Sequence, residues 1–129
     1  MTRLIIGTAQ FGMNYGIANS TGQPSESTIR AIIEHATENE IFYYDTAISY
    51  GSSEEVLGKI FCELGIHQQV RVFTKIPKLA KVSSLASILE HVDQSLSKLK
   101  THQIFGLLLH SELDRSYLCL LYTSPSPRD

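Results

Sequence analysis

Hydrophobic residues along the chain form four short runs. Longer stretches of mixed apolar and polar residues separate these runs. Each run is rich in β-branched or aromatic residues and ends at a polar or turn residue, which predicts a strand. The four runs cover residues 4–6, 41–45, 70–75 and 104–110. The fourth is nearly continuous in apolar residues, which is typical of a strand buried on both faces.

The stretches between the runs carry apolar residues three or four positions apart, as on one face of a helix. The predicted helix starts are Ser25, Ser52 and either Ser83 or Ser84. Glu55 follows Ser52 by three residues, so this pair predicts a capping box. Asn39 is the predicted end of the first helix. Residues 7–12 contain two glycines and predict a loop.

The predicted order is therefore β-α-β-α-β-α-β, with about 35 residues in each unit, and such alternation favours a parallel sheet of the α/β class. This order fits an open doubly wound sheet, and it also fits the first four βα units of a (β/α)8 TIM barrel. The pattern alone leaves both open. Gly7, Gly12 and Gly16 lack the G-x-G-x-x-G spacing of a dinucleotide-binding turn, which argues against an open sheet of that type.

Polar side chains stand where the predicted strands end. Asp45 closes the second strand, Lys75 the third and His110 the fourth, and Tyr50 follows Asp45 by five residues. In a parallel barrel the carboxyl ends of all strands meet at one face, where active sites are built. The sequence therefore predicts that these four side chains converge on one pocket.

Such a set can protonate a carbonyl group. Asp45 can balance the charge of Lys75 on the neighbouring strand, and a lysine cation beside a tyrosine favours the phenolate, which makes Tyr50 a stronger proton donor. His110 can donate a hydrogen bond that orients the carbonyl oxygen. A hydride donor is missing from this set, so a cofactor must supply the hydride.

Composition and charge narrow the possible partners. The chain has 129 residues with 11 basic and 13 acidic side chains, so it lacks the basic excess of a nucleic-acid-binding protein. Two distant cysteines provide neither a disulfide framework nor metal-ligand spacing, so no metal site is predicted. Cys62 falls on the apolar side of its helix and predicts a small core residue. The sequence shows no signal peptide or membrane span, and we expect a cytoplasmic location.

The last eleven residues differ from the rest of the chain. Residues 119–129 contain two Ser-Pro steps and resemble the translation of a transposase-based sequencing adapter. We therefore expect residues 1–118 to be the native part, with 119–129 a non-native tail that is excluded from the fold. On this interpretation the native protein continues beyond Leu118.

Four segments together resemble the aldo-keto reductases over about residues 3–118. The segment 44–54 (YDTAISYGSSE) is similar to the family's strand-two motif D-T-A-x-x-Y-G-x-S-E, and 6–12 (IGTAQFG) to its first strand and loop. The segment 73–75 (FTK) resembles the lysine motif of strand three, and 107–110 (LLLH) the histidine motif of strand four. The resemblance implies the N-terminal half of a (β/α)8 barrel.

The resemblance also implies roles for the residues named above. Tyr50 is the expected general acid, Asp45 and Lys75 its tuning pair, and His110 the group that orients the carbonyl. Thr8 and Asp45 are expected near the nicotinamide ribose. The implied reaction reduces a small-molecule aldehyde or ketone with NADPH or NADH. Most of the cofactor site belongs to the second half of the barrel, so the 129-residue chain is expected to be inactive alone.

Two other functions remain compatible with the sequence. The same fold can serve as a non-catalytic subunit that senses the nicotinamide cofactor. Alternatively, Lys75 can act as the Schiff-base nucleophile of an aldolase barrel. The substrate, the choice between NAD and NADP, and the oligomeric state are left open by the sequence.

Overall fold

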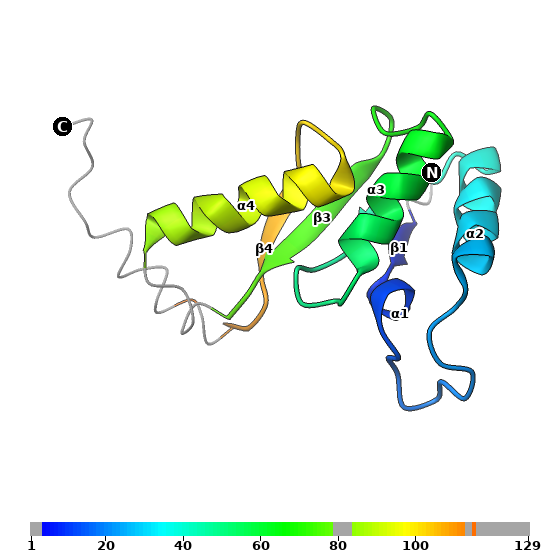
Figure 1. Ribbon diagram of the computed structural model, residues 1–129, viewed down its shortest axis with the longest axis horizontal. Coiled ribbons are helices and arrows are strands. Elements are labelled where there is room, and N and C mark those ends of the chain that lie inside the picture. Colours follow the sequence, from blue (N-terminus) through cyan, green and yellow to red (C-terminus); the bar gives the residue numbers. More distant parts are fainter. Residues whose placement is uncertain (1–3, 79–83, 113–114, 116–129) are drawn as a thin grey trace.

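One parallel sheet organises the chain in a computed structural model that describes residues 4–78, 84–112 and 115 (Figure 1). Its four strands follow one another in chain order, and each pairs in parallel with the next. They are β1 (Ile5–Gly7), β2 (Tyr43–Asp45), β3 (Arg71–Ile76) and β4 (Gly106–Leu109). The prediction of a parallel α/β arrangement is confirmed. The alternative cap Ser83 and the tail 119–129 lie outside the described residues.

Helices connect the strands in the predicted alternation. They are α1 (Ala9–Gly12), α2 (Glu26–Glu38), α3 (Ser53–Glu63) and α4 (Leu85–Leu99). Ser25 caps α2 by accepting a hydrogen bond from Thr28 N, Asn39 ends it, and Ser84 caps α4, all as predicted. Among the described residues, no helix combines the length and apolar character that crossing a membrane requires.

Two local predictions are wrong. Residues 9–12 form the short helix α1 where a loop was expected. Ser52 does precede α3, but its side chain makes no capping hydrogen bond, because its φ of -90° and ψ of 11° depart from the extended backbone of a capping residue. Glu55 instead lies exposed with its Oε1 3.9 Å from Lys98 Nζ on α4. The predicted capping box is therefore absent.

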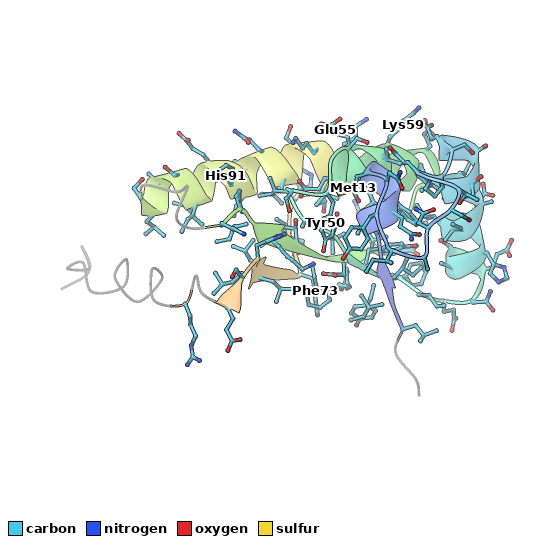
Figure 2. The ribbon with its side chains drawn as sticks, turned by 90° about the horizontal axis from the view of Figure 1, so that it is seen from below. Met13, Tyr50, Glu55, Lys59, Phe73 and His91 are labelled. Atoms are coloured by element: carbon cyan, nitrogen blue, oxygen red, sulfur yellow. The ribbon has the colours of Figure 1, made fainter. Side chains whose placement is uncertain are left out.

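In the part of the chain that the structure describes, helices cover one face of the sheet and leave the other face uncovered (Figure 2). Along β3 the residues alternate strictly: Val72, Thr74 and Ile76 are buried under the helices, while Phe73 and Lys75 lie on the other face. The largest buried side chains of the helix side are Ile29, Ile33, Tyr44, Leu57, Ile60, Phe61 and Leu99. This cluster fixes α2, α3 and α4 over the strands, and the polar residues of the opposite face remain available for chemistry.

Strand β4 is more exposed than predicted. Leu107 and Leu108 keep 45% and 42% of their surface accessible, which corrects the expectation of burial on both faces. The reason is position: β4 ends the strand order and pairs only with β3, so nothing in the described part of the chain covers its outer side. Cys62 is likewise exposed, which corrects its predicted place in the core.

Tyr44 offers a test of the core. Its side chain is fully buried, its hydroxyl has no hydrogen-bond partner in the described structure, and burial raises its pKa from 10.0 to about 12. An unfolded tyrosine loses its proton near pH 10, whereas the folded one keeps it to about pH 12. The unfolded state therefore binds fewer protons in this window, and stability falls as the pH rises across it, by up to about 3 kcal/mol.

We expect Tyr44→Phe to remove this alkaline loss and to raise stability at pH 7 by about 1 kcal/mol, because a buried hydroxyl without a partner is costly. The edge-to-face contact with Phe61, at 4.9 Å between ring centroids, is kept in the variant. Urea unfolding of the whole protein at pH 7, 10 and 11 measures both effects. Parallel stability curves for the two proteins from pH 7 to 11 would contradict the prediction.

Candidate active site

Asp45 and Lys75 form an ion pair at the carboxyl ends of β2 and β3. Lys75 Nζ donates to Asp45 Oδ1 at 2.6 Å and to the Thr46 carbonyl at 3.2 Å. The chain after β2 continues beside β3, where Thr46 N donates to Phe73 O and Ile48 N to Lys75 O, and this pairing brings the Thr46 carbonyl within reach of the lysine. The pair is partly buried, with 17% of the Lys75 side chain and 35% of the Asp45 side chain exposed.

Tyr50 lies in the turn between this segment and α3, as Figure 2 shows beside Met13. Lys75 Nζ lies 5.1 Å from the centroid of the Tyr50 ring, so the cation stands over the aromatic face. The turn packs closely on α1: a Cβ on Gly12 would overlap the Tyr50 carbonyl oxygen, and Gly51 adopts a φ of +55° that favours glycine. The backbone around Tyr50 is thus set by contact with the end of α1.

His110 directly follows β4 and is joined to the same turn. Its Nδ1 lies 3.3 Å from Ser49 Oγ, in the residue before Tyr50. When the serine hydroxyl donates to Nδ1, the neutral ring carries its proton on Nε2. That arrangement leaves an N–H donor on the imidazole that can bind a carbonyl oxygen.

A hollow of about 220 Å³ opens at the ends of β1 and β2. Its lining residues are Gly7, Thr8, Ala9, Gln10, Tyr15, Asp45 and Tyr50. Thr8 is fully buried in its floor, and its hydroxyl donates to the Asp45 carbonyl at 2.9 Å. A complete site for a drug-sized ligand takes roughly 300–1,000 Å³, so this hollow is smaller than such a site.

The structure brings the residues predicted from the sequence into two linked groups. Thr8, Asp45 and Tyr50 line the hollow, and Lys75 joins them through its contacts with the aspartate and the tyrosine ring. His110 is joined to this group through Ser49 and does not line the hollow itself.

Two polar side chains of the hollow were missed by the sequence reasoning. Tyr15 stacks obliquely on Tyr50 with 6.4 Å between ring centroids, and Gln10 Nε2 donates to the Tyr15 carbonyl. Gln10 lies in the segment 7–12 that was predicted as a loop, and Tyr15 lies just beyond it, where no periodicity marks an inward side chain. The sequence signal that could have indicated Gln10 is its place inside the segment 6–12.

Three buried polar residues under the site were also not assigned a role. Ser53 and Glu54 begin α3, and Thr74 Oγ1 on β3 donates to Glu54 Oε2 at 3.0 Å. All three are at most 2% exposed. Ser53 and Glu54 stand inside the segment that resembles the strand-two motif, so the resemblance contained the signal.

Comparison with known proteins identifies the family to which this chain belongs. The model of the aldo/keto reductase family matches residues 3–117, which is most of the chain. The chain belongs to the aldo-keto reductase family. It is 29% identical over 132 aligned residues to YrpG of Bacillus subtilis, an uncharacterized oxidoreductase. The alignment covers 89% of this chain and 37% of that protein.

Solved structures share the fold. A protein of Pseudomonas aeruginosa assigned to the aldo-keto reductases superposes with a TM-score of 0.71 at 28% identity, over 86% of this chain and 43% of that one. An aldo-keto reductase of the silkworm Bombyx mori, solved with NADP, superposes with a TM-score of 0.60 at 24% identity, over 78% of this chain and 31% of that one. The chain therefore spans less than half the length of these relatives. Its fold corresponds to the first four βα units of their barrel.

Proposed function

We propose that the whole protein containing this chain reduces the carbonyl group of a small aldehyde or ketone with NADPH or NADH, and that this chain supplies the acid–base part of the active site. One observation carries the proposal. The ammonium group of Lys75 is held by Asp45 at 2.6 Å while it stands over the ring of Tyr50, beside a hollow that can accept one end of a dinucleotide.

The role that we propose for each side chain follows from which of the other side chains it contacts. Tyr50 donates its phenolic proton to the carbonyl oxygen, and the lysine cation stabilises the phenolate that remains. Asp45 holds the lysine in place through their ion pair. His110 binds the carbonyl oxygen through its Nε2 proton and orients the carbonyl for attack.

A nicotinamide cofactor, when bound, would supply the hydride that reduces the carbonyl carbon. Thr8 and Asp45 lie in the hollow where we place the nicotinamide end. The size of the hollow means that the remainder of a dinucleotide must bind elsewhere, and the silkworm relative solved with NADP supports a nicotinamide cofactor. We therefore expect the 129-residue chain to show no turnover when it is tested alone.

The geometry favours reduction over Schiff-base chemistry at Lys75. A nucleophilic lysine must have its amine free to attack, whereas this amine is engaged by a carboxylate and by a backbone carbonyl. A non-catalytic sensor would keep the same side chains and bind the cofactor without turnover. Turnover therefore separates the two remaining functions.

The test uses the whole protein with NADPH or NADH and a panel of small aldehydes and ketones, followed by the loss of reduced-nicotinamide absorbance. Turnover with at least one substrate is expected. Borohydride added with substrate serves as the parallel assay for an aldolase. Cofactor binding without turnover would favour the sensor, and covalent labelling of Lys75 would favour the aldolase; either result would reject the reductase.

A further inference from the structure

A cluster of hydroxyl groups lies directly beneath the proposed active site, on the helix side of the sheet. It consists of Thr8 after β1, Thr46 after β2 and Ser53 at the start of α3, and all three side chains are fully buried. Ser53 Oγ lies 2.9 Å from Thr8 Oγ1, 3.0 Å from the Thr8 carbonyl oxygen and 3.0 Å from Thr46 Oγ1. One serine hydroxyl thus joins two strand ends to a helix.

The hydrogens of this cluster can be assigned without leaving a donor unused. Thr46 donates to Ser53 Oγ, Ser53 donates to Thr8, and Thr8 Oγ1 donates to the Asp45 carbonyl oxygen. Three hydroxyl hydrogens meet three acceptors, which is the condition for burying polar groups at little cost. The chain of bonds ends on the backbone of the aspartate that holds Lys75.

The backbone of Ser53 contacts the turn that carries Tyr50. Its N–H donates to the Tyr50 carbonyl at 3.0 Å, which closes the turn that carries the proposed acid. Thr46, which Ser53 holds by its side chain, offers its carbonyl oxygen to Lys75 Nζ at 3.2 Å. Ser53 therefore lies between the backbone of Tyr50 and the backbone that anchors Lys75.

We propose that Ser53 is a positioning residue that sets the distance between the Lys75 ammonium and the Tyr50 ring. It contacts neither substrate nor cofactor and acts only by fixing the two backbone segments on which those groups depend. The inference rests on the proposed carbonyl reductase function. Without the serine hydroxyl, Thr46 loses its partner, so its carbonyl and the lysine that it binds can shift relative to the tyrosine.

The test compares Ser53→Ala with Ser52→Ala in the whole protein. Ser52 is the adjacent residue, and its side chain makes no capping hydrogen bond, so its substitution is the matched control. We expect Ser53→Ala to lower kcat about tenfold, because a displaced Lys75 stabilises the developing Tyr50 phenolate less well, with KM for the carbonyl substrate unchanged. Ser52→Ala is expected to match the unmodified protein.

A second measurement needs neither substrate nor cofactor. Tyrosine labelled with ¹³C at Cζ, assigned through Tyr50→Phe, reports the surroundings of the Tyr50 ring by its NMR chemical shift. In Ser53→Ala this chemical shift is expected to change, because the Lys75 ammonium, which lies 5.1 Å from the ring centroid, is displaced. A purely structural serine would lower thermal stability and leave both this chemical shift and the kcat of the folded protein unchanged.

The outcomes separate this inference from the proposed function. If the unmodified protein shows no turnover, the reductase function fails, and the NMR chemical shift alone then decides the role of Ser53. If the unmodified protein turns over and Ser53→Ala matches it in both kcat and chemical shift, the positioning role is rejected. Should Ser53→Ala fail to fold, Thr46→Val removes the same hydrogen bond with little change in volume and is judged by the same two readouts.

Discussion

Tyr50→Phe is expected to lower kcat of the whole protein by about 100- to 10,000-fold, because it removes the proton that we propose is transferred to the carbonyl oxygen. The substitution deletes one oxygen atom and keeps the aromatic ring. Lys75 can therefore remain over the ring, 5.1 Å from its centroid, and the turn onto α1 is unaffected. The affinity for the nicotinamide cofactor should change little, so the loss falls on the chemical step.

Tyr15→Phe is the matched control for this experiment. Tyr15 lines the same hollow and lies 6.4 Å from Tyr50 between ring centroids, but it is 53% exposed and has no assigned proton. Steady-state kinetics and cofactor titration of both variants give the comparison. Equal losses in the two variants, or a Tyr50→Phe protein with nearly full kcat, would show that Tyr50 is not the acid.

Lys75→Met should produce the second large effect, a loss of at least 100-fold in kcat together with a loss of stability. Methionine keeps most of the length of the side chain but removes the cation that we propose stabilises the Tyr50 phenolate. It also leaves the Asp45 carboxylate without its partner at 2.6 Å. Because both side chains are partly exposed, we expect a stability loss of about 1–3 kcal/mol, less than for a fully buried pair.

The double variant Asp45→Asn with Lys75→Met separates catalysis from stability. Removing the unpaired carboxylate is expected to restore most of the lost stability, since a neutral amide is cheaper to bury, and to leave activity as low as in Lys75→Met. Urea unfolding and steady-state kinetics on the unmodified protein, the two single variants and the double variant complete the cycle. Recovery of activity in the double variant would show that Lys75 does not act on Tyr50.

Much of the fold could be predicted because the relevant signals are local. Alternation of short apolar runs with helical spacing predicted the order of strands and helices, and hydroxyl side chains marked the starts of α2 and α4 at Ser25 and Ser84. The predicted convergence of Asp45 and Lys75 follows from one rule, that parallel strands end at a common edge. Their hydrogen bond agrees with that rule.

The failed predictions depend on contacts between distant segments. Ser52 has the sequence of a helix cap, but its backbone N–H donates to the Gly12 carbonyl, and this contact accompanies a backbone conformation unsuited to capping. The leucines of β4 suggest burial, yet their exposure depends on how many neighbours the strand has. A local sequence pattern indicates neither the contact between Ser52 and Gly12 nor the number of strands beside β4.

The sequence by itself determined which side chains stand at the ends of the strands, and so which chemistry the proposed active site can perform. Only the tertiary structure decided which hydrogen bonds the side chains of the site form. Lys75 bonds to Asp45 and to the Thr46 carbonyl, and Ser53 bonds to two threonines. The physical reason is the accuracy with which a hydrogen bond requires its atoms to be placed. Strand order places a residue to within a few ångströms, whereas a hydrogen bond forms only near 3 Å and in the right direction, which the packing of α3 against the strand ends provides.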